Sequence, residues 1–203
     1  MTRLVLLVLL ALVVVAPTPR FAQATGEPFE PPSSAHWFGT DDLGRDVFAG
    51  VAEGARLSLL VAASTAAIAL ALGAVIGVAA GFTGGLVDEA LMRVVEAFQV
   101  VPRFFLALVV LTVWSFDLGH LILVLGLTSW SGLARLARAE TLTLKERDFV
   151  VAARASGAGA VRLMAAHVLP GAVRPLVASL PLVASAAMLT EAGLSFLGIG
   201  TLE

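Results

Sequence analysis

The stretch "DFVVAARASGAGAVRLMAAHVLPGAVRPLV", residues 148–177, lies between two long apolar runs and differs from both of them. Its apolar residues are mostly small, and two glycines, Gly157 and Gly159, interrupt a helical pattern. The stretch also contains three arginines and a histidine before it reaches Pro175. To interpret this segment, the class of protein has to be established first from the composition and from the apolar runs on either side of it.

Composition places the chain among integral membrane proteins. Hydrophobic residues make up 59% of the sequence and charged residues 14%, with a mean hydropathy of +0.96, which is far from a soluble domain. A net charge of -2 gives no reason to expect a polyanionic partner, so nucleic acid is excluded. The sequence has no cysteine, which excludes a disulfide framework, a thiolate nucleophile and a cysteine-based metal site.

Four apolar runs are close to the ~20 residues that a helix needs to cross a bilayer. A fifth run, residues 4–16, has 13 residues and would span only ~20 Å as a helix. It is either a short first span or a signal peptide, since Arg3 precedes it and "AQA" at residues 22–24 resembles a cleavage site. We therefore expect an all-α polytopic membrane helix bundle with about five transmembrane helices. The four longer runs are residues 57–82, 100–116, 118–136 and 176–199.

The placement of basic residues predicts the topology, because Lys and Arg in short loops stay in the cytoplasm. Seven of the 13 basic residues lie between Arg135 and Arg174, whereas residues 17–56 carry three basic and six acidic residues. The sequence therefore predicts three regions: a first helix or signal peptide, an external segment, and a membrane core with a cytoplasmic loop at residues 138–174. Counting crossings puts the connection at residues 84–102 inside and Asp117 at an outer turn. The three regions are residues 1–20, 21–56 and 57–203.

Two features inside the spans stand out. Gly73, Gly77 and Gly81 are spaced four apart, so they share one helical face on which another helix backbone can approach closely. Glu191 is an acidic residue well inside a span, where a charge at mid-bilayer costs ~2.5 kcal/mol or more. Glu191 faces either an aqueous translocation path or the bundle interior, or it lies at the membrane interface near the outer end of the helix.

A search for catalytic, cofactor-binding or metal-binding residues gives no candidate. A P-loop needs Gly-Lys before Ser or Thr, but the only lysine, Lys145, follows Leu144. Ser195 could be imagined as a protease nucleophile, yet all three histidines precede it, whereas rhomboid-type proteases keep their base on a later helix. His36 and His120 fall at outer-loop positions and are expected to be surface residues. We therefore expect a non-enzymatic chain without cofactor or metal.

Residues 151–171, "VAARASGAGAVRLMAAHVLPG", resemble the EAA loop of ABC importer permeases. The family pattern is Glu-Ala-Ala, three residues, Gly, nine residues, Ile, one residue and Leu-Pro, and every spacing is kept. Val151 stands where the pattern has glutamate, and His167 where it has isoleucine, a substitution that the peptide branch tolerates. The matching residues are Ala152, Ala153, Gly157, Leu169 and Pro170.

Two further stretches narrow the resemblance to the dipeptide, oligopeptide and nickel importer permeases. Residues 36–59, "HWFGTDDLGRDVFAGVAEGARLSL", are similar to the segment before the second helix of that branch, and "EAGLSFLGIG", residues 191–200, to the end of its fifth helix. The resemblance covers nearly all of the chain from about residue 35 onward. A weaker match extends to the first helix, which favours an uncleaved span at residues 4–16.

The resemblance implies a permease subunit in a bacterial or archaeal inner membrane. Its expected partners are separate ABC ATPase subunits, a second permease subunit, identical or different, and an external solute-binding protein that delivers a peptide or a nickel-like solute. Residues 148–170 would couple to the ATPase. Small residues would let this segment approach the ATPase closely, Gly157 would permit a turn, and the next span would begin near Pro170 and Pro175. The expected coupling residues are Ala152, Ala153, Arg154, Gly157, His167, Leu169 and Pro170.

One departure from the family concerns length. The family fold has six core spans and ends in the cytoplasm, whereas this sequence stops at Glu203 after five predicted spans. We expect a truncated form or a fragment, and a degenerate, nontransporting membrane scaffold is the alternative function.

Overall fold

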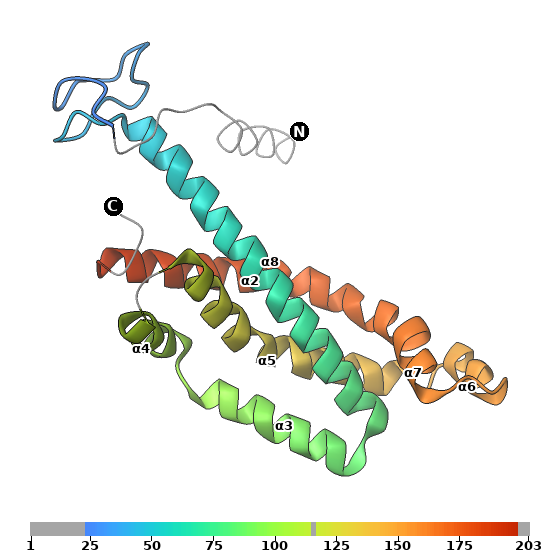
Figure 1. The fold of residues 1–203 in the computed structure, drawn as a ribbon. Coiled ribbons are helices and arrows are strands. Elements are labelled where there is room, and N and C mark those ends of the chain that lie inside the picture. The colour runs from blue at the N-terminus through green and yellow to red at the C-terminus, as the bar shows by residue number, and fades with distance from the viewer. Residues whose placement is uncertain (1–22, 115–116, 199–203) are drawn as a thin grey trace. The chain divides into compact units, whose positions relative to one another are not determined.

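The computed structural model describes residues 23–114 and 117–198, and these residues form helices joined by loops and turns (Figure 1). Within them, β-structure is limited to two isolated bridges, Ala24 with Arg45 and Thr40 with Asp46. The expected all-α membrane bundle is confirmed. In chain order the elements are α2 (Val47–Thr83), α3 (Gly85–Val100), α4 (Arg103–Trp114), α5 (Leu118–Leu144), α6 (Asp148–Ala155), α7 (Ala160–Arg162), the π-helix η1 (Leu163–Val168) and α8 (Leu169–Phe196).

Three helical stretches in the described residues are long and apolar enough to cross a membrane, and a fourth exists only as a bent pair. The three are Val47–Thr83, Leu118–Leu144 and Ala160–Phe196. Helices α3 and α4 qualify together, but their axes differ by 78°. The fifth predicted span, residues 4–16, lies outside the described residues.

The prediction of a span at residues 100–116, with residues 84–102 as a connection, is wrong, because α4 qualifies as a crossing only together with α3. Helix α4 has 12 residues, or ~18 Å, which is short of the ~30 Å hydrocarbon core. The supposed connection is mostly α3, a 16-residue helix. Pro102 explains the break, because a proline disfavours helical geometry in the residue before it, and Val101 is extended with φ -80° and ψ 122°.

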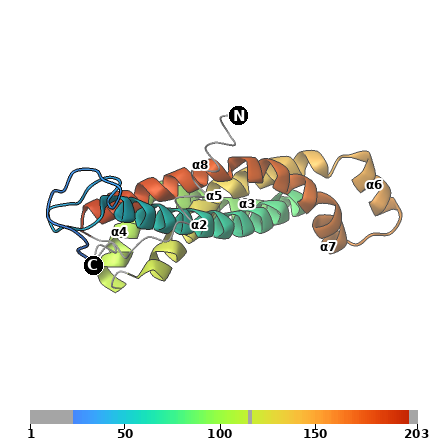
Figure 2. The same cartoon turned by 90° about the horizontal axis from the view of Figure 1, so that it is seen from above.

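The described residues divide into two compact units, one up to Leu60 and one from Val61 onward, and each is described by itself. In the second unit, α5 packs against α8, α4 and α3, and it lies beside α8 in both views (Figures 1 and 2). Its apolar face supplies much of the core. The largest cluster combines Trp130, Leu133, Ala134 and Ala137 of α5 with Ala69 and Ala74 of α2, Val95 of α3 and Leu176 of α8.

The three spaced glycines of α2 face α5 at backbone distance. A Cβ atom built on Gly73 would lie 2.6 Å from the Cβ of Leu133, and one on Gly81 would lie 2.8 Å from the carbonyl oxygen of Arg138. A Cβ on Gly77 would overlap the carbonyl oxygen of Ala134. Since real Cβ atoms do not approach other atoms so closely, these positions have no room for a side chain.

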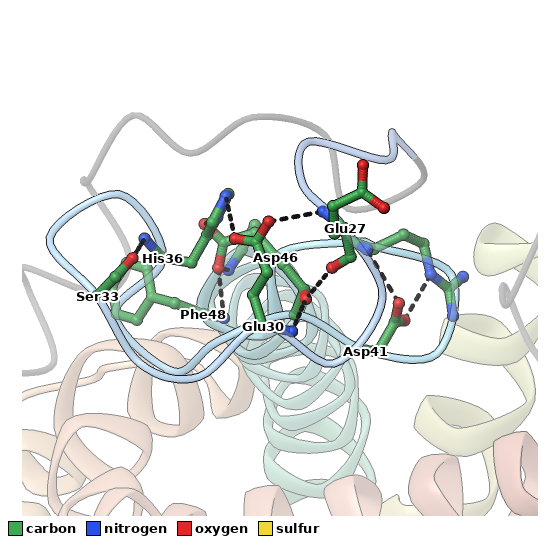
Figure 3. A network of polar contacts seen from close by, with 10 residues as sticks. Glu27, Glu30, Ser33, His36, Asp41, Asp46 and Phe48 are labelled. Carbon is green, nitrogen blue, oxygen red and sulfur yellow. Dashed lines mark hydrogen bonds and ion pairs between the residues drawn. The ribbon is translucent and has the colours of Figure 1, made fainter.

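In the first unit, residues 23–46 form a loop closed by polar contacts (Figure 3). His36 is buried there, with Nδ1 3.4 Å from Asp46 Oδ2 and Nε2 3.8 Å from Glu30 Oε2. The prediction of His36 as a surface residue is therefore wrong, because the loop folds back over its ring. Asp46 also caps α2, since its Oδ1 accepts hydrogen bonds from the backbone N–H of Phe48 at 2.8 Å and of Ala49 at 3.3 Å.

Asp41 organises the turn that leads into this contact. Its Oδ1 accepts from the backbone N–H groups of Leu43 and Arg45, both at 2.9 Å, and its Oδ2 from Arg45 Nε at 2.7 Å. Desolvation raises the pKa of Asp41, but the backbone N–H groups of Arg45 and Leu43 and the Arg45 side chain together hold the pKa below its usual range. The carboxylate is therefore ionised at neutral pH.

Candidate functional site

The connecting segment, residues 148–170, joins the end of α5 to the start of α8 (Figure 1). The segment was predicted as a loop, but most of it is helical. Helix α5 continues to Leu144, and α8 already begins at Leu169, so most of the predicted loop at residues 138–174 consists of helix ends, α6, α7 and η1. Ala152, Ala153 and Arg154 lie on α6. His167 lies in η1, and Leu169 and Pro170 open α8.

Helix α6 has one face against the bundle and one face in the open. Val150 is completely buried in a cluster with Val78 of α2, Leu163 and Val168 of η1 and Ala172 of α8. Ala153, three residues further on, packs against the same cluster. Phe149 and Val151, which flank Val150 on different sides of the helix, are each half exposed, and Ala152 is exposed between them.

The end of α6 is set by a glycine turn. Gly157 has φ +87°, in the left-handed region that favours glycine. Its N–H donates to the carbonyl of Arg154 at 3.0 Å, and the N–H of Ala158 donates to that of Ala153 at 3.1 Å. These two bonds form a Schellman motif, which ends a helix and satisfies its last carbonyls. Because no atom lies within 4 Å of a Cβ built on Gly157, its requirement for glycine is conformational and not steric.

Arg154 ties α6 to the end of α2. Its guanidinium carbon lies 5.8 Å from the centroid of the Phe82 ring, which is cation–π geometry. The sequence predicted Arg154 as a coupling residue and as a charge that keeps the segment in the cytoplasm. Neither this contact nor the buried role of Val150 was predicted. The one sequence signal for Val150 is its spacing of three from Ala153, which places both on one helical face.

The return to the bundle runs through the π-helix η1 into α8. His167 is half-buried, and its Nδ1 lies 3.5 Å from the carbonyl oxygen of Arg162. Pro170 lies in the first turn of α8, where its missing N–H costs nothing. The span was expected to begin near Pro170 and Pro175, and α8 begins at Leu169, next to Pro170, whereas Pro175 lies inside the helix. Burial of the adjacent Leu176 against α5 holds the helix continuous there.

Glu191 is buried inside the bundle, with 8% of its surface exposed. The hydroxyl of Ser195 donates to Glu191 Oε1 at 3.0 Å, one turn further along α8. Its neighbours on α8, Ala187 and Leu194, pack with Ala107 and Leu111 of α4. Glu191 therefore lies where α8 meets α4, far along the chain from the connecting segment. Among residues 23–114 and 117–198, no group of acidic and histidine side chains has the geometry to hold a metal ion.

Comparison with known proteins covers most of the chain. Residues 73–202 match the family described as "Binding-protein-dependent transport system inner membrane component". The oligopeptide transport system permease protein OppC of Bacillus subtilis is 37% identical over 171 residues, which are 84% of this chain and 56% of that protein. The dipeptide transport system permease protein DppC of the same organism is 37% identical over 170 residues, or 84% of this chain and 53% of that protein. The chain thus spans about half the length of these relatives.

Proposed function

This chain belongs to the family of binding-protein-dependent transport system inner membrane components, and from that premise we propose that it is a permease subunit of an ATP-driven peptide importer. The two relatives at 37% identity are named for oligopeptide and dipeptide transport, which supports peptides as the solute class. Nickel, the other solute suggested by the resemblance, has no such support from these names. The chain is a multi-pass membrane protein, and its function in the complex would be to form part of the solute path.

The two-faced helix α6 is the observation that carries the coupling part of this proposal. Val150 and Arg154 fix α6 to the bundle, while the apolar residues Phe149, Val151 and Ala152 are left exposed on the rest of its surface. A short, firmly anchored helix with an open apolar face suits docking to another protein, since interface centres are apolar and often aromatic. We infer that the occupant is a cytoplasmic ATPase subunit, which would hydrolyse ATP on behalf of the permease.

The remaining partners follow from the same family. An external binding protein would deliver the peptide, and a second permease subunit, identical or different, would complete the path. The excess of basic residues between Arg135 and Arg174 supports a cytoplasmic position for the connecting segment. We propose that Glu191, which is buried where α8 meets α4, contributes a polar group to that path.

The docking face can be tested with two matched substitutions on α6. The test uses the full-length permease assembled with its partner subunits, and it measures ATPase copurification and uptake of a labelled peptide into proteoliposomes. Phe149→Glu places a charge in the proposed apolar contact, and we expect copurification and uptake to fall about tenfold, as loss of an interface anchor does. Val151→Glu makes a similar change at an equally exposed position, but the family pattern carries glutamate there, so we expect binding to persist.

Two outcomes would contradict the proposal in different ways. If Phe149→Glu copurified and transported normally, α6 would not be the docking helix. If the wild-type assembly took up no peptide in the presence of ATP, the permease assignment itself would fail, and the chain would be a nontransporting scaffold.

A further inference from the structure

Two basic side chains, Arg138 of α5 and Lys145 directly after its last residue, reach the turn between α2 and α3. Arg138 and Lys145 are seven residues apart, or about two helical turns. Arg138 donates from Nε to Asp88 Oδ1 and from Nη2 to Asp88 Oδ2, both at 2.6 Å. Lys145 donates from Nζ to the carbonyl oxygen of Gly81 at 3.0 Å. The end of α5 therefore holds the last turn of α2 and the first turn of α3 together.

The Asp88–Arg138 pair is unusually directional for a contact between helices. Both carboxylate oxygens meet the planar guanidinium, so the pair fixes orientation as well as distance. The side chain of Asp88 is 14% exposed and that of Arg138 is 35% exposed, so water only partly screens the charges. Within the first turn of α3, Asp88 is turned inward, whereas Leu86, Val87 and Glu89 are exposed.

Helix α3 is separated from its neighbours in the chain by a break at each end. Gly84, which joins α2 to α3, and Gly85, the first residue of α3, both have positive φ, at 67° and 56°. At the other end, α3 meets α4 at a bend of 78°. The far half of α3 rests on α5 through buried Val95 and the edge-to-face contact of Phe98 with Trp130, whose ring centroids are 5.2 Å apart. The first turn of α3 lies between the glycine break and this packed half, and the contact of Asp88 with Arg138 holds it.

The end of α5 that carries Arg138 is followed closely in the chain by α6. Only residues 145–147 separate α5 from α6, and they are hydrogen-bonded within that turn, since Arg147 N–H donates to the carbonyl of Leu144 at 3.1 Å and Val150 N–H to that of Arg147 at 2.9 Å. With so short a connection, a displacement of α6 must displace the end of α5, and Arg138 is within two turns of that end.

We propose that the Asp88–Arg138 pair is a positioning contact. It makes α3 and α4 together, the α3–α4 arm (Gly85–Val100 and Arg103–Trp114), follow the end of α5 when the ATPase displaces α6. This inference rests on the proposed function. An apolar contact between the same helices would hold them together but would let them slide, and replacing a buried ion pair by apolar residues is often neutral for stability. The pair's distinct contribution is a fixed geometry between α3 and α5. Through α4, the arm reaches Ala187 and Leu194, on either side of Glu191.

The first test measures how many peptides enter per ATP hydrolysed in proteoliposomes that contain the complete transporter. Asp88→Asn removes the charge, and we expect the ATPase to copurify and hydrolyse ATP while uptake per ATP falls at least about fivefold, the lower end of typical coupling between sites. Glu89→Gln is the matched control. It removes a neighbouring charge whose partner, Arg93, is on α3 itself at 3.8 Å, so the ratio should not change.

The second test follows the arm directly and would not respond to a merely structural contact. Because the sequence has no cysteine, one spin label can be attached at Val113→Cys, an exposed position at the end of the arm, and the other at Leu182→Cys, an exposed position on α8 outside the arm. ATP binding should change the distance between the labels in the parent and in Glu89→Gln, and leave it unchanged in Asp88→Asn. An unchanged uptake ratio and a normal distance change in Asp88→Asn would overturn the proposal.

Two controls keep the outcomes distinct. If Asp88→Asn does not accumulate, the double variant D88R/R138D, which reverses the two charges, is measured instead. Recovery of both accumulation and the uptake ratio supports the proposal. Recovery of accumulation without the uptake ratio overturns it. Failure of the proposed function would be visible already in the wild type, as absence of ATP-driven uptake, and this inference would fall with it.

Discussion

At the scale of single residues, two glycines in the same turn have different requirements. Gly157 and Gly159 are two positions apart, and both have open space where a side chain would begin. Gly157 has φ +87°, whereas Gly159 has φ -68° and ψ 159°, an ordinary extended conformation. Backbone geometry alone therefore separates two residues that look interchangeable in the sequence.

This difference predicts unequal effects of the same substitution. Gly157→Ala forces a side chain into the left-handed region and should destabilise the turn by about 1–2 kcal/mol, whereas Gly159→Ala should be neutral or slightly stabilising. Hydrogen exchange of the α6 amides in the intact permease measures the effect. Faster exchange in Gly157→Ala than in Gly159→Ala is expected, and equal exchange in the two variants would show that the turn does not depend on Gly157.

At the scale of helices, the glycine seam, formed where Gly73, Gly77 and Gly81 of α2 meet α5, gives the sharpest steric prediction. Gly77→Leu places a side chain against the Ala134 carbonyl and the Ala137 Cβ, which is 2.5 Å from a Cβ built on Gly77, and should cost about 1–3 kcal/mol or more through overpacking. Val75→Leu enlarges a side chain that is 64% exposed and should have little effect. Thermal stability and yield of the purified permease measure both. Equal tolerance would place the seam away from α5.

Sequence patterns predicted the long helices better than the broken one. Long apolar runs indicated α2, α5 and α8, although α2 begins at Val47, ten residues before the predicted span. The same reasoning failed for α3, because Asp88, Glu89, Arg93 and Glu96 lower its hydropathy below that of a span. Since Asp88 is neutralised by Arg138 from 50 residues away, its cost cannot be judged from local composition.

The π-helix explains why the periodicity before α8 was not informative. Leu163 and Val168 are both buried in the same cluster although they are five residues apart. In an α-helix, a spacing of five places side chains about 140° apart, on different faces. A π turn, with its i to i+5 hydrogen bonds, brings them to one face, and no 3.6-residue pattern can reveal that.

The connecting segment shows the same limit at a candidate site. Spacing located Gly157 and the Leu169–Pro170 pair, because these positions are fixed within the segment itself. The anchors of α6 depend on distant residues, since Val150 packs on Val78 and Arg154 lies over Phe82. Which face of α6 is open is therefore a property of the folded chain, and the sequence alone could not separate Phe149 from Val150.

At the scale of the whole molecule, the distribution of charge predicts which loops face the cytoplasm. Ser33 and Ser156 are both exposed, and the sequence has no cysteine, so each can be replaced by a single reactive thiol. Ser33→Cys should react with a membrane-impermeant maleimide added to intact cells, because residues 17–56 carry excess acidic charge. Ser156→Cys should react only after the membrane is permeabilised. The opposite pattern would invert the topology and exclude α6 as a docking site for a cytoplasmic ATPase.

The bend between α3 and α4 has a consequence for hydration. A helix leaves its last four carbonyls and first four N–H groups without intrahelical partners, so a break places two sets of such groups at one point, and Pro102 brings no N–H of its own. Hydrocarbon cannot solvate these dipoles, and each one left bare would cost several kcal/mol. The stretch from Val100 to Arg103 therefore has to meet water or another protein surface. If α3 and α4 together make one crossing, the bilayer next to them cannot be continuous lipid at that depth.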